Sequence, residues 1–480
     1  MATYAPGRSC SAYPRRFAMK NTVRRRLHSG VFANITLGLL PAFVILALAS
    51  TVQGREAPDI GGASRPCGAE ASVGCGYPQQ PPERTLREQV EYWERGKASL
   101  EQGRYEEAAE AFTAAIEIGP KAGVLFIARG NAYRKLGKPD LALVDYDEAI
   151  RMEPYIASGY TNRGSVYREL NKPDLAIADY DEAIRLDPGS AFSYNGRGNV
   201  RRELGQYEDA ISDYSEAIRL DPEYAFAFNG RGNAYQEQGD LDLAITDYTK
   251  AIDLRSNYEL PYLNRGNAHR ELGRQEKAIS DYEEALKINP NSAFALNNRG
   301  NVYRELGKLT LALEDFSRAI EISPTFAFAF NNRGRAHREL GKLQLAINDY
   351  TQAIKLNPTY VVAYNNRANA YLQDGQVTLA VADYDEAIGL DPDFVEAFMG
   401  RGMATLQLGG LQLARSDFEQ AVTLQPSNAT YHRRIAESLF SSGHAAEALP
   451  YGRKAIELDG ADQSSARLLS EILASMGEPD

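Results

Sequence analysis

Asparagine recurs at three places in a pattern with a 34-residue period, and its amide is the side chain here best suited to hold another polypeptide. When each block is numbered from Gln89 as position 1, asparagine appears repeatedly at positions 5, 6 and 9. An amide both donates and accepts hydrogen bonds, as a peptide backbone does. Asparagine is also a poor residue inside helices. The pattern therefore indicates a track that holds an extended chain without reading much of its sequence.

Phenylalanine and arginine accompany these amides. Positions 2, 5, 9 and 12 share one helix face by their spacing, position 2 is Phe or Leu in the middle blocks, and Arg recurs at position 12 beside Glu at position 13. The phenylalanines would take apolar side chains, whereas neighbouring Arg and Glu nearly cancel. The candidate peptide-binding residues are Phe192, Asn195, Asn199, Arg202, Phe226, Asn229, Asn233, Asn264, Asn267, Arg270, Phe294, Asn297, Asn298, Asn301, Arg304, Phe328, Asn331, Asn332, Arg338, Asn365, Asn366 and Asn369. The alternative is that they bond between neighbouring blocks and that the phenylalanines pack under loops.

No residue pattern indicates catalysis. The five histidines are scattered, and His269 and His337 occupy position 11, where other blocks have tyrosine, which favours a packing role. No zinc-ligand spacing, phosphate-binding loop or nucleophile motif stands out. We therefore expect neither an enzyme nor a bound cofactor or metal.

The sequence pattern that must position these side chains recurs eleven times along the chain. Blocks of 34 residues run from 89 to 462 without insertion or deletion. Ala fills positions 20 and 27 in all eleven blocks, position 8 is Gly or Ala, position 24 is aromatic in ten, and position 32 is Pro in nine. Each block contains two helical periods, which in the seventh block are separated by Gly307 and followed by Pro324. We expect two-helix hairpins that stack, with Gly at position 8 allowing close approach to Ala at position 20.

This pattern resembles the tetratricopeptide repeat family. The matching positions are an aromatic residue at 4, Gly at 8, Tyr at 11, Ala at 20, an aromatic residue at 24, Ala at 27 and Pro at 32. The resemblance implies an all-α, right-handed superhelical solenoid of about eleven 34-residue helix-turn-helix repeats. It also implies a non-catalytic protein-binding scaffold whose first helices line a concave groove.

One departure from the family pattern is a charge pair. Position 7, usually apolar in the family, is Arg in ten blocks, and position 23 is Asp in nine of the same ten. We predict that the two side chains pair within each hairpin, as Arg299 with Asp315. The alternative is two solvated charges that happen to repeat.

The end of the array is irregular. In the eleventh block, His432, Gly452 and Gly460 replace residues that are aromatic or Pro in most other blocks. Residues 463–480 follow as a predicted capping helix and tail, with Leu468 and Ile472 on its apolar face.

The first 53 residues have the pattern of an export signal or an amino-terminal membrane anchor. Arg24 begins a basic triplet, an apolar run follows from 31 to 49, and an A-x-A pattern precedes Ser50. Residues 31–52 are also long enough to span a bilayer uncleaved. Translation from Met19 would give the more typical signal. Residues 54–88 are expected to form a Pro/Gly-rich linker, in which Cys67 and Cys75 are either bridged or free thiols.

Charge bears on the choice of partner. Eight basic and no acidic residues lie at or before Arg55, so the remainder carries 53 − 8 = 45 basic against 64 acidic residues. An acidic body is a poor binder of nucleic acid. We expect an exported protein, periplasmic or membrane-anchored, that binds extended segments of other proteins and helps to assemble an envelope complex. The alternatives are an accessory subunit that recruits substrates to a separate envelope enzyme, and a self-assembling structural protein.

Overall fold

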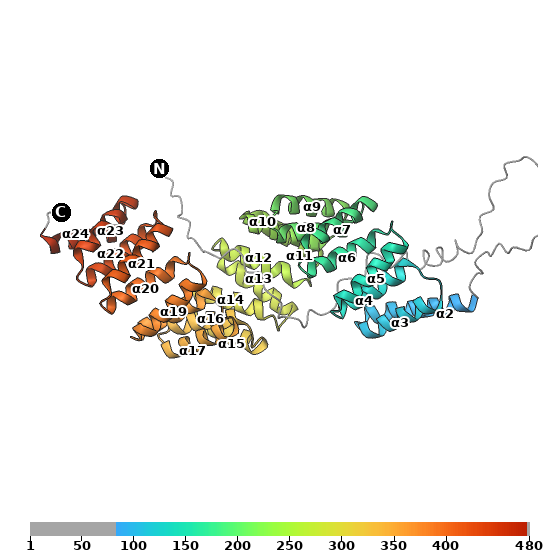
Figure 1. The fold of residues 1–480 in the computed structure, drawn as a ribbon, viewed down its shortest axis with the longest axis horizontal. Helices are drawn as coiled ribbons and strands as arrows, with labels where there is room; N and C mark the ends of the chain where they lie inside the picture. The colour runs from blue at the N-terminus through green and yellow to red at the C-terminus, as the bar shows by residue number, and fades with distance from the viewer. Residues whose placement is uncertain (1–82, 478–480) are drawn as a thin grey trace, which may run out of the picture. The chain divides into compact units, whose positions relative to one another are not determined.

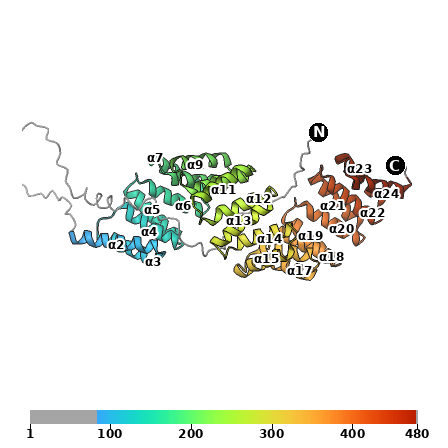
Figure 2. The same cartoon turned by 180° about the vertical axis from the view of Figure 1, so that it is seen from behind.

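The computed structural model describes residues 83–477, which form helices joined by short turns and contain no strand. The chain divides into two compact units, with the boundary between Pro188 and Gly189. Within each unit, helices that are consecutive in the sequence pack side by side (Figures 1 and 2). The expected all-α array of helix pairs is confirmed.

The helices alternate between a first and a second member of each pair, which we call A-helices and B-helices. In unit 1 the pairs are α2 (Glu83–Glu101) with α3 (Tyr105–Ile118), α4 (Gly123–Lys135) with α5 (Pro139–Met152), and α6 (Ala157–Glu169) with α7 (Pro173–Leu186). In unit 2 they are α8 (Ala191–Glu203) with α9 (Tyr207–Leu220), α10 (Ala225–Gln238) with α11 (Leu241–Leu254), α12 (Glu259–Glu271) with α13 (Gln275–Ile288), α14 (Ala293–Glu305) with α15 (Leu309–Ile322), α16 (Ala327–Glu339) with α17 (Leu343–Leu356), α18 (Val361–Gln373) with α19 (Val377–Leu390), α20 (Val395–Gln407) with α21 (Leu411–Leu424), and α22 (Ala429–Ser441) with α23 (Ala445–Leu458). The last helix is α24 (Gln463–Met476).

The turn inside each pair depends on a left-handed residue at position 15. Gly307 has φ of 71° there, as the sequence predicts for a helix stop. In the third repeat the position holds Asn171, with φ of 56°, and it is the only non-glycine residue with positive φ in the described part of the chain. Asn is the residue that best replaces Gly in this conformation. The hairpin geometry is therefore retained in a repeat that lacks the glycine.

Small residues let each pair close tightly. The alanines at positions 20 and 27, such as Ala312 and Ala319, are fully buried. A Cβ placed on Gly300, at position 8, would lie 2.8 Å from the ring of Phe316. The expected close approach to the alanine at position 20 is present as well, since a Cβ on Gly164 would lie 3.2 Å from the carbonyl oxygen of Ala176. The aromatic ring at position 24 of the same repeat takes the space that a side chain at position 8 would need.

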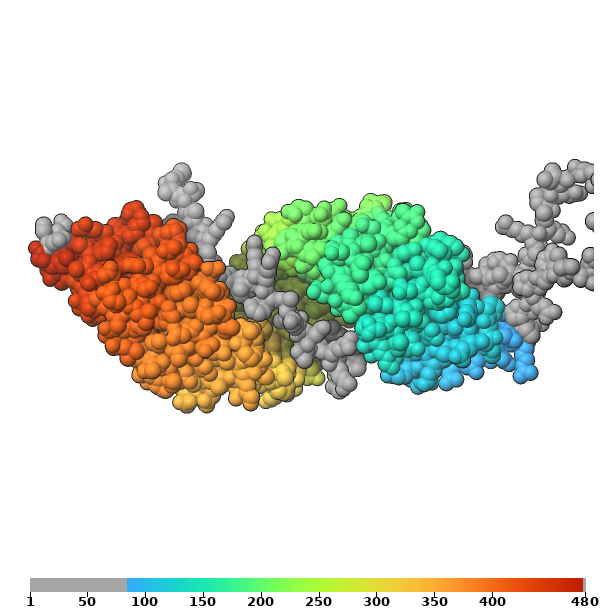
Figure 3. Space-filling model, in the orientation of Figure 1, coloured from blue at the N-terminus to red at the C-terminus, as the bar shows by residue number. Residues whose placement is uncertain are grey.

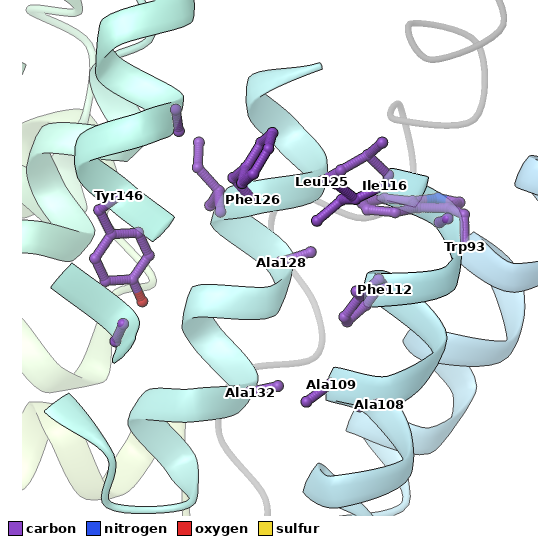
Figure 4. Close-up of a cluster of buried hydrophobic side chains, with 14 of the residues drawn as sticks. Trp93, Ala108, Ala109, Phe112, Ile116, Leu125, Phe126, Ala128, Ala132 and Tyr146 are labelled. Atoms are coloured by element: carbon purple, nitrogen blue, oxygen red, sulfur yellow. The ribbon is translucent and has the colours of Figure 1, made fainter. Parts of the chain in front are cut away.

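The first pair extends beyond the repeat boundary read from the sequence. Helix α2 begins at Glu83, so the final part of the expected linker, residues 83–88, is helical. Arg84 and Glu88 lie one turn apart and pair at 3.0 Å, which supports the added turn. Trp93 packs on Phe112 with ring centroids 5.4 Å apart, in a buried cluster that includes Leu125 (Figure 4).

The carboxyl-terminal helix closes the last pair. Helix α24 packs against α22 and α23, and Leu468, Ile472 and Leu473 are buried there. A Cβ on Gly452 would lie 3.4 Å from Ile472 and 3.5 Å from Leu469. The capping helix therefore covers the site where other repeats bury an aromatic ring. The side chains of these last repeats, orange to red in Figure 3, form a continuous surface on the face shown.

No helix among residues 83–477 has the length and apolar character needed to span a membrane. Several predicted features lie outside the described residues. They are the export segment, the alternative anchor, both linker cysteines and residues 54–82 of the linker.

Candidate functional site

The predicted binding residues lie on the A-helices, and we call the surface formed by positions 2, 5, 9 and 12, together with the adjoining position 6, the A-face. Along the A-face of unit 2, asparagines bond from one repeat to the next. The amide of Asn264 donates to Asn229 at 3.0 Å and to Asn233 at 2.9 Å, and Asn298 donates to Asn267 at 3.0 Å. Asn332 donates to Asn297 and Asn366 to Asn331, each at 2.9 Å. These bonds, each between residues 31 or 35 positions apart in the sequence, form an amide ladder across α10, α12, α14, α16 and α18.

A second set of bonds fixes position 9 from within each repeat. The hydroxyl of the tyrosine at position 24 donates to the asparagine at position 9, as Tyr282 does to Asn267 at 2.7 Å. The same bond joins Tyr214 to Asn199, Tyr248 to Asn233 and Tyr384 to Asn369, each at 2.9 Å. The remaining predicted asparagines, Asn195, Asn301 and Asn365, are buried. The amides are thus largely used inside the array, as the alternative interpretation of the sequence anticipates. Binding of a peptide by them stays a prediction.

The arginines at position 12 are neutralised by the next repeat. Arg202 pairs with Glu237 at 2.6 Å, Arg270 with Glu305 at 2.7 Å, and Arg304 with Glu339 at 2.7 Å. The sequence predicted cancellation between neighbouring Arg and Glu of one helix. The structure shows that the charges cancel between adjacent A-helices instead. Arg338 is the last arginine of this series, and the residue at the same offset from it is Gln373, which carries no charge.

The phenylalanines at position 2 lie at the amino-terminal end of the A-face. Phe294 contacts Phe326, and Phe328 contacts both Phe326 and Tyr360, with ring centroids 5.0 to 6.2 Å apart. Phe226 contacts Tyr224 and Tyr258 in the same manner, whereas Phe192 is partly buried. Phe294 remains 55 % exposed and Phe328 39 % exposed. These rings are therefore held in place while part of their apolar surface stays open to solvent.

The Arg–Asp pairs at positions 7 and 23 form in all nine repeats that have both residues. Arg299 donates from Nε and Nη2 to the two carboxylate oxygens of Asp315, at 2.9 and 2.7 Å. This two-point hydrogen bond raises the pKa of Arg299. The other eight pairs are Arg129–Asp145, Arg163–Asp179, Arg197–Asp213, Arg231–Asp247, Arg265–Asp281, Arg333–Asp349, Arg367–Asp383 and Arg401–Asp417. The predicted pairing is confirmed, and its geometry is that of a structural clamp.

Within each unit, most of these clamps also reach the preceding repeat. The third guanidinium nitrogen of Arg265 donates to Thr249 at 3.0 Å, and that of Arg231 donates to Ser215 at 3.1 Å. One arginine therefore joins its own B-helix to the B-helix before it.

Sequence reasoning missed two residues of the eighth repeat, one on the A-face and one on the B-helix α17. Arg335 stands at position 9, where Asn occurs in the repeats on either side. The hydroxyl of Tyr350, at position 24, is buried and has no hydrogen-bond partner in the described structure. Comparison of the blocks at position 9 would have singled out Arg335. The orphaned hydroxyl could not be recognised without knowing that positions 9 and 24 meet.

The A-face combines hydrogen-bonding amides with partly exposed apolar side chains. No group of three or more His, Cys, Asp or Glu side chains suited to a metal ion occurs among the described residues.

A stack of helix pairs with this residue pattern defines the class of helical repeat proteins. Models described as TPR repeat or Tetratricopeptide repeat match eleven segments of the chain, which are 90–122, 125–155, 157–190, 179–212, 198–239, 232–273, 266–307, 293–326, 334–375, 361–394 and 399–465. Together they cover well over half of the sequence. The chain belongs to the tetratricopeptide repeat family, whose members are generally non-catalytic scaffolds for protein interaction.

Solved structures with similar folds are distant. A chain of the APC/C hetero-tetramer Cut9-Hcn1 is 14 % identical, with 80 % of this chain and 96 % of that chain covered and a TM-score of 0.45. Yeast Tom70 is 14 % identical, with 82 % and 96 % covered and a TM-score of 0.42. YrrB, described as a TPR protein with an unusual peptide-binding site, is 27 % identical over 38 % of this chain and 95 % of its own, with a TM-score of 0.32. No curated protein matches the sequence.

Proposed function

We propose that this protein is a non-catalytic scaffold that binds extended segments of other proteins along the A-face of unit 2. The observation that carries the proposal is the row of exposed apolar side chains at position 2 of three successive repeats. Leu260, Phe294 and Phe328 are 45 %, 55 % and 39 % exposed. Apolar groups repeated at one-repeat spacing on a folded surface are typical of a protein interaction site.

The polar part of the A-face fits the same kind of ligand. Each asparagine amide has two N–H groups and two acceptor lone pairs, and a ladder bond uses only one of them on each partner. The ladder also fixes the orientation of each amide, so a bound backbone would meet groups that need little further ordering. An extended segment that crosses several A-helices would gain a modest amount of binding free energy from each helix.

We place this activity outside the cytoplasm, in the cell envelope. Support comes from the sequence alone, in which a basic triplet precedes an apolar run and an A-x-A pattern. Amino-terminal sequencing of the protein purified from envelope fractions tests the location. A mature chain that starts at Ser50 supports cleavage, whereas recovery of the full-length chain only from the cytoplasmic fraction contradicts export.

Selection from a random linear peptide library displayed on phage tests the binding function. Wild-type protein should enrich peptides that contain apolar residues, and the double variant Phe294→Ser with Phe328→Ser should lose that enrichment. The matched control is Leu311→Ser with Leu345→Ser, because these leucines lie on the B-helices of the same two repeats and are 41 % and 47 % exposed. Equal loss of binding in the two double variants would contradict the proposal.

A second candidate function is self-assembly through the B-helices. Position 19 is Leu in four successive repeats, and Leu311, Leu345, Leu379 and Leu413 are all 41–49 % exposed. Sedimentation velocity tests this candidate directly. A concentration-dependent oligomer that Leu345→Glu with Leu379→Glu abolishes would support self-assembly.

A further inference from the structure

The first turns of the B-helices change in charge part-way along the array. Position 18 is acidic in each of the first six repeats, as in Asp242 and Glu276. In the next four repeats it is Thr or Gln, and no acidic residue occurs in the first turns of α15, α17, α19 and α21. An acid in the first turn stabilises a helix, because it faces the positive end of the helix dipole. Four successive helices therefore lack a stabilising charge that the six before them have.

The same four helices carry a row of exposed leucines. Position 19, next to the missing acid, is Leu311, Leu345, Leu379 and Leu413, which are 41–49 % exposed. Positions 18, 19 and 22 of repeats 7–10 are all exposed, and we call the surface that they form the B-face. Its single charge is that of Glu314, although the chain as a whole has 64 acidic and 53 basic residues. The B-face is therefore an apolar, nearly uncharged surface on an acidic protein.

The B-face consists of separate ridges. The A-helix α16 contacts both α14 and α18, but the B-helices of the same repeats do not come as close to one another. Long side chains bridge them instead, as Arg333 does by bonding to Asp349 of α17 and to Ser317 of α15. Four leucine-bearing ridges, one repeat apart, fit best against a surface that has ridges at the same spacing. The B-face of a second copy has that spacing by necessity.

A membrane would be a poorer match for the B-face. Helix faces that bind membranes are typically rich in Lys and Arg and carry aromatic residues, and the B-face has none of these. The acidity of the chain would also oppose contact with anionic lipids. The same acidity limits how two copies can meet, because rows of acidic first turns repel one another. Contact through the B-face keeps such rows out of the interface.

We propose that the B-face is the contact surface of a dimer in which two copies meet with their repeats in opposite order. The inference rests on the second candidate function, self-assembly through the B-helices, and adds the repeats, the number of copies and their direction. Contact about a two-fold axis uses the same surface on both copies and closes at two. In the opposite order, the seventh repeat faces the tenth and the eighth faces the ninth.

Charge favours the opposite order over the same order. Glu314 belongs to the seventh repeat, and Arg415 is exposed beside the B-face in the tenth. The opposite order brings these unlike charges to the same end of the interface. The same order would place Glu314 against its own counterpart, which like charge disfavours.

The variant that tests the B-face also restores the pattern of the earlier repeats. Gln344→Glu with Thr378→Asp returns an acid to position 18 of α17 and α19. At a protein concentration too low for association, its thermal midpoint should equal or exceed that of the wild type. Acids on the two copies would then meet across the interface, so the dimer should dissociate about tenfold or more readily.

Sedimentation velocity of the full-length chain over a wide range of concentrations measures this effect. Wild type should form a dimer and no larger species. The control Asn291→Asp with Thr359→Asp adds the same charge at position 33, which is already acidic in Glu223 and Asp393. This control should dimerise as wild type does. Equal weakening of the dimer by the two double variants would overturn the proposal.

Cross-linking tests the order of the repeats. Leu311→Cys and Leu413→Cys are introduced separately into a full-length chain with Cys10→Ser, Cys67→Ser and Cys75→Ser. A short bismaleimide should join the two proteins to each other in a mixture and should leave Leu311→Cys alone uncoupled. Efficient coupling of Leu311→Cys to itself would overturn the opposite order.

The remaining outcomes separate this inference from the functions proposed above. A wild type that stays monomeric would overturn both the dimer and self-assembly. A monomer that sediments with phosphatidylcholine vesicles, and loses this binding on Gln344→Glu with Thr378→Asp, would overturn the dimer and assign the B-face to a membrane. Association that this variant leaves intact would overturn the B-face alone. Phe294→Ser with Phe328→Ser, on the A-face, should dimerise as wild type does, so peptide binding and dimerisation can fail independently.

Discussion

At the scale of single residues, the arginine at position 7 makes three kinds of contact. Its side chain pairs with the aspartate of its own B-helix, reaches the B-helix before it, and lies over an aromatic ring of its own A-helix, as Arg265 does over Tyr262 at 5.8 Å. Such a group is costly to disturb, because the buried aspartate depends on it.

Removal of Arg299 should therefore cost more than removal of the whole pair. Arg299→Ala leaves the carboxylate of Asp315 buried without a counter-charge, at a cost of about 3–5 kcal/mol in the free energy of unfolding. The double variant Arg299→Ala with Asp315→Ala should recover part of that loss. Urea denaturation followed by circular dichroism measures the free energy of unfolding of the two single variants and of the double variant. A double variant that loses the sum of the two single losses would show that the charges act independently.

The tyrosines at position 24 should respond unequally to loss of the hydroxyl. Tyr350→Phe removes an unsatisfied buried group, so stability at neutral pH should stay the same or rise slightly. Tyr282→Phe removes a bond to Asn267 and should cost about 1 kcal/mol. Thermal midpoints of the two variants provide the measurement. Equal losses would mean that Tyr350 has an acceptor after all.

Much at this scale could be read from the sequence because the eleven blocks act as an internal alignment. The pairing of Arg299 with Asp315 is predicted because both residues recur together in nine blocks, which favours a pair over two independent charges. The contact between Gly300 and Phe316 could not be predicted, because sequence spacing does not show that the ring of Phe316 points into its own hairpin. The asparagines presented two consistent interpretations. Only the distance between Asn332 and Asn297 shows that the amides bond to one another.

At the scale of secondary-structure elements, α24 supplies the apolar packing that an aromatic ring at position 24 provides in the other repeats. Gly452 stands where other repeats have an aromatic ring, and Ile472 and Leu469 of the capping helix cover it. The sequence predicted this helix from its apolar face. It did not predict the division of the array between Pro188 and Gly189, since the 34-residue register continues across that point without any change of pattern.

Loss of packing under α24 should loosen only the end of the array. Ile472 is fully buried, and Ile472→Ala should cost about 2–4 kcal/mol by leaving a cavity. Hydrogen exchange should accelerate in α22, α23 and α24 and stay slow in α14 and α15, because each repeat contacts only its neighbours. Met476→Ala, at a residue 38 % exposed, is the control and should change little. Faster exchange throughout unit 2 would contradict local fraying.

At the scale of the whole molecule, the recurring buried tyrosines should make the folded protein less stable at alkaline pH. Burial raises the pKa of Tyr350 to about 12 and raises the pKa of Tyr146, Tyr248 and Tyr384 as well. An unfolded tyrosine has a pKa of about 10, so the folded state holds these protons more strongly. The resulting stability is complete below pH 10 and is lost as the pH rises toward the folded values.

Urea midpoints measured at pH 8, 10 and 11.5 should fall most steeply over the last interval. Each pKa unit of difference contributes roughly 1.4 kcal/mol per tyrosine, so several such residues act together. Tyr248→Phe with Tyr384→Phe should reduce the slope, since phenylalanine does not ionise and already serves at position 24 in Phe316 and Phe418. A midpoint independent of pH over this range would contradict burial of the hydroxyls.

The offsets of the bonds between repeats recur along the array, and this has a consequence for how such a chain can change its length. Asn332 bonds 35 residues back to Asn297, Asn366 bonds 35 residues back to Asn331, and Arg304 pairs 35 residues ahead with Glu339. A coding segment of 34 codons that is duplicated or lost by recombination within this region leaves donor facing acceptor at the new junction. Most insertions into a globular domain break its core, whereas this region can grow or shrink by whole units. The number of repeats, and with it the length of the A-face, can therefore change in single genetic steps.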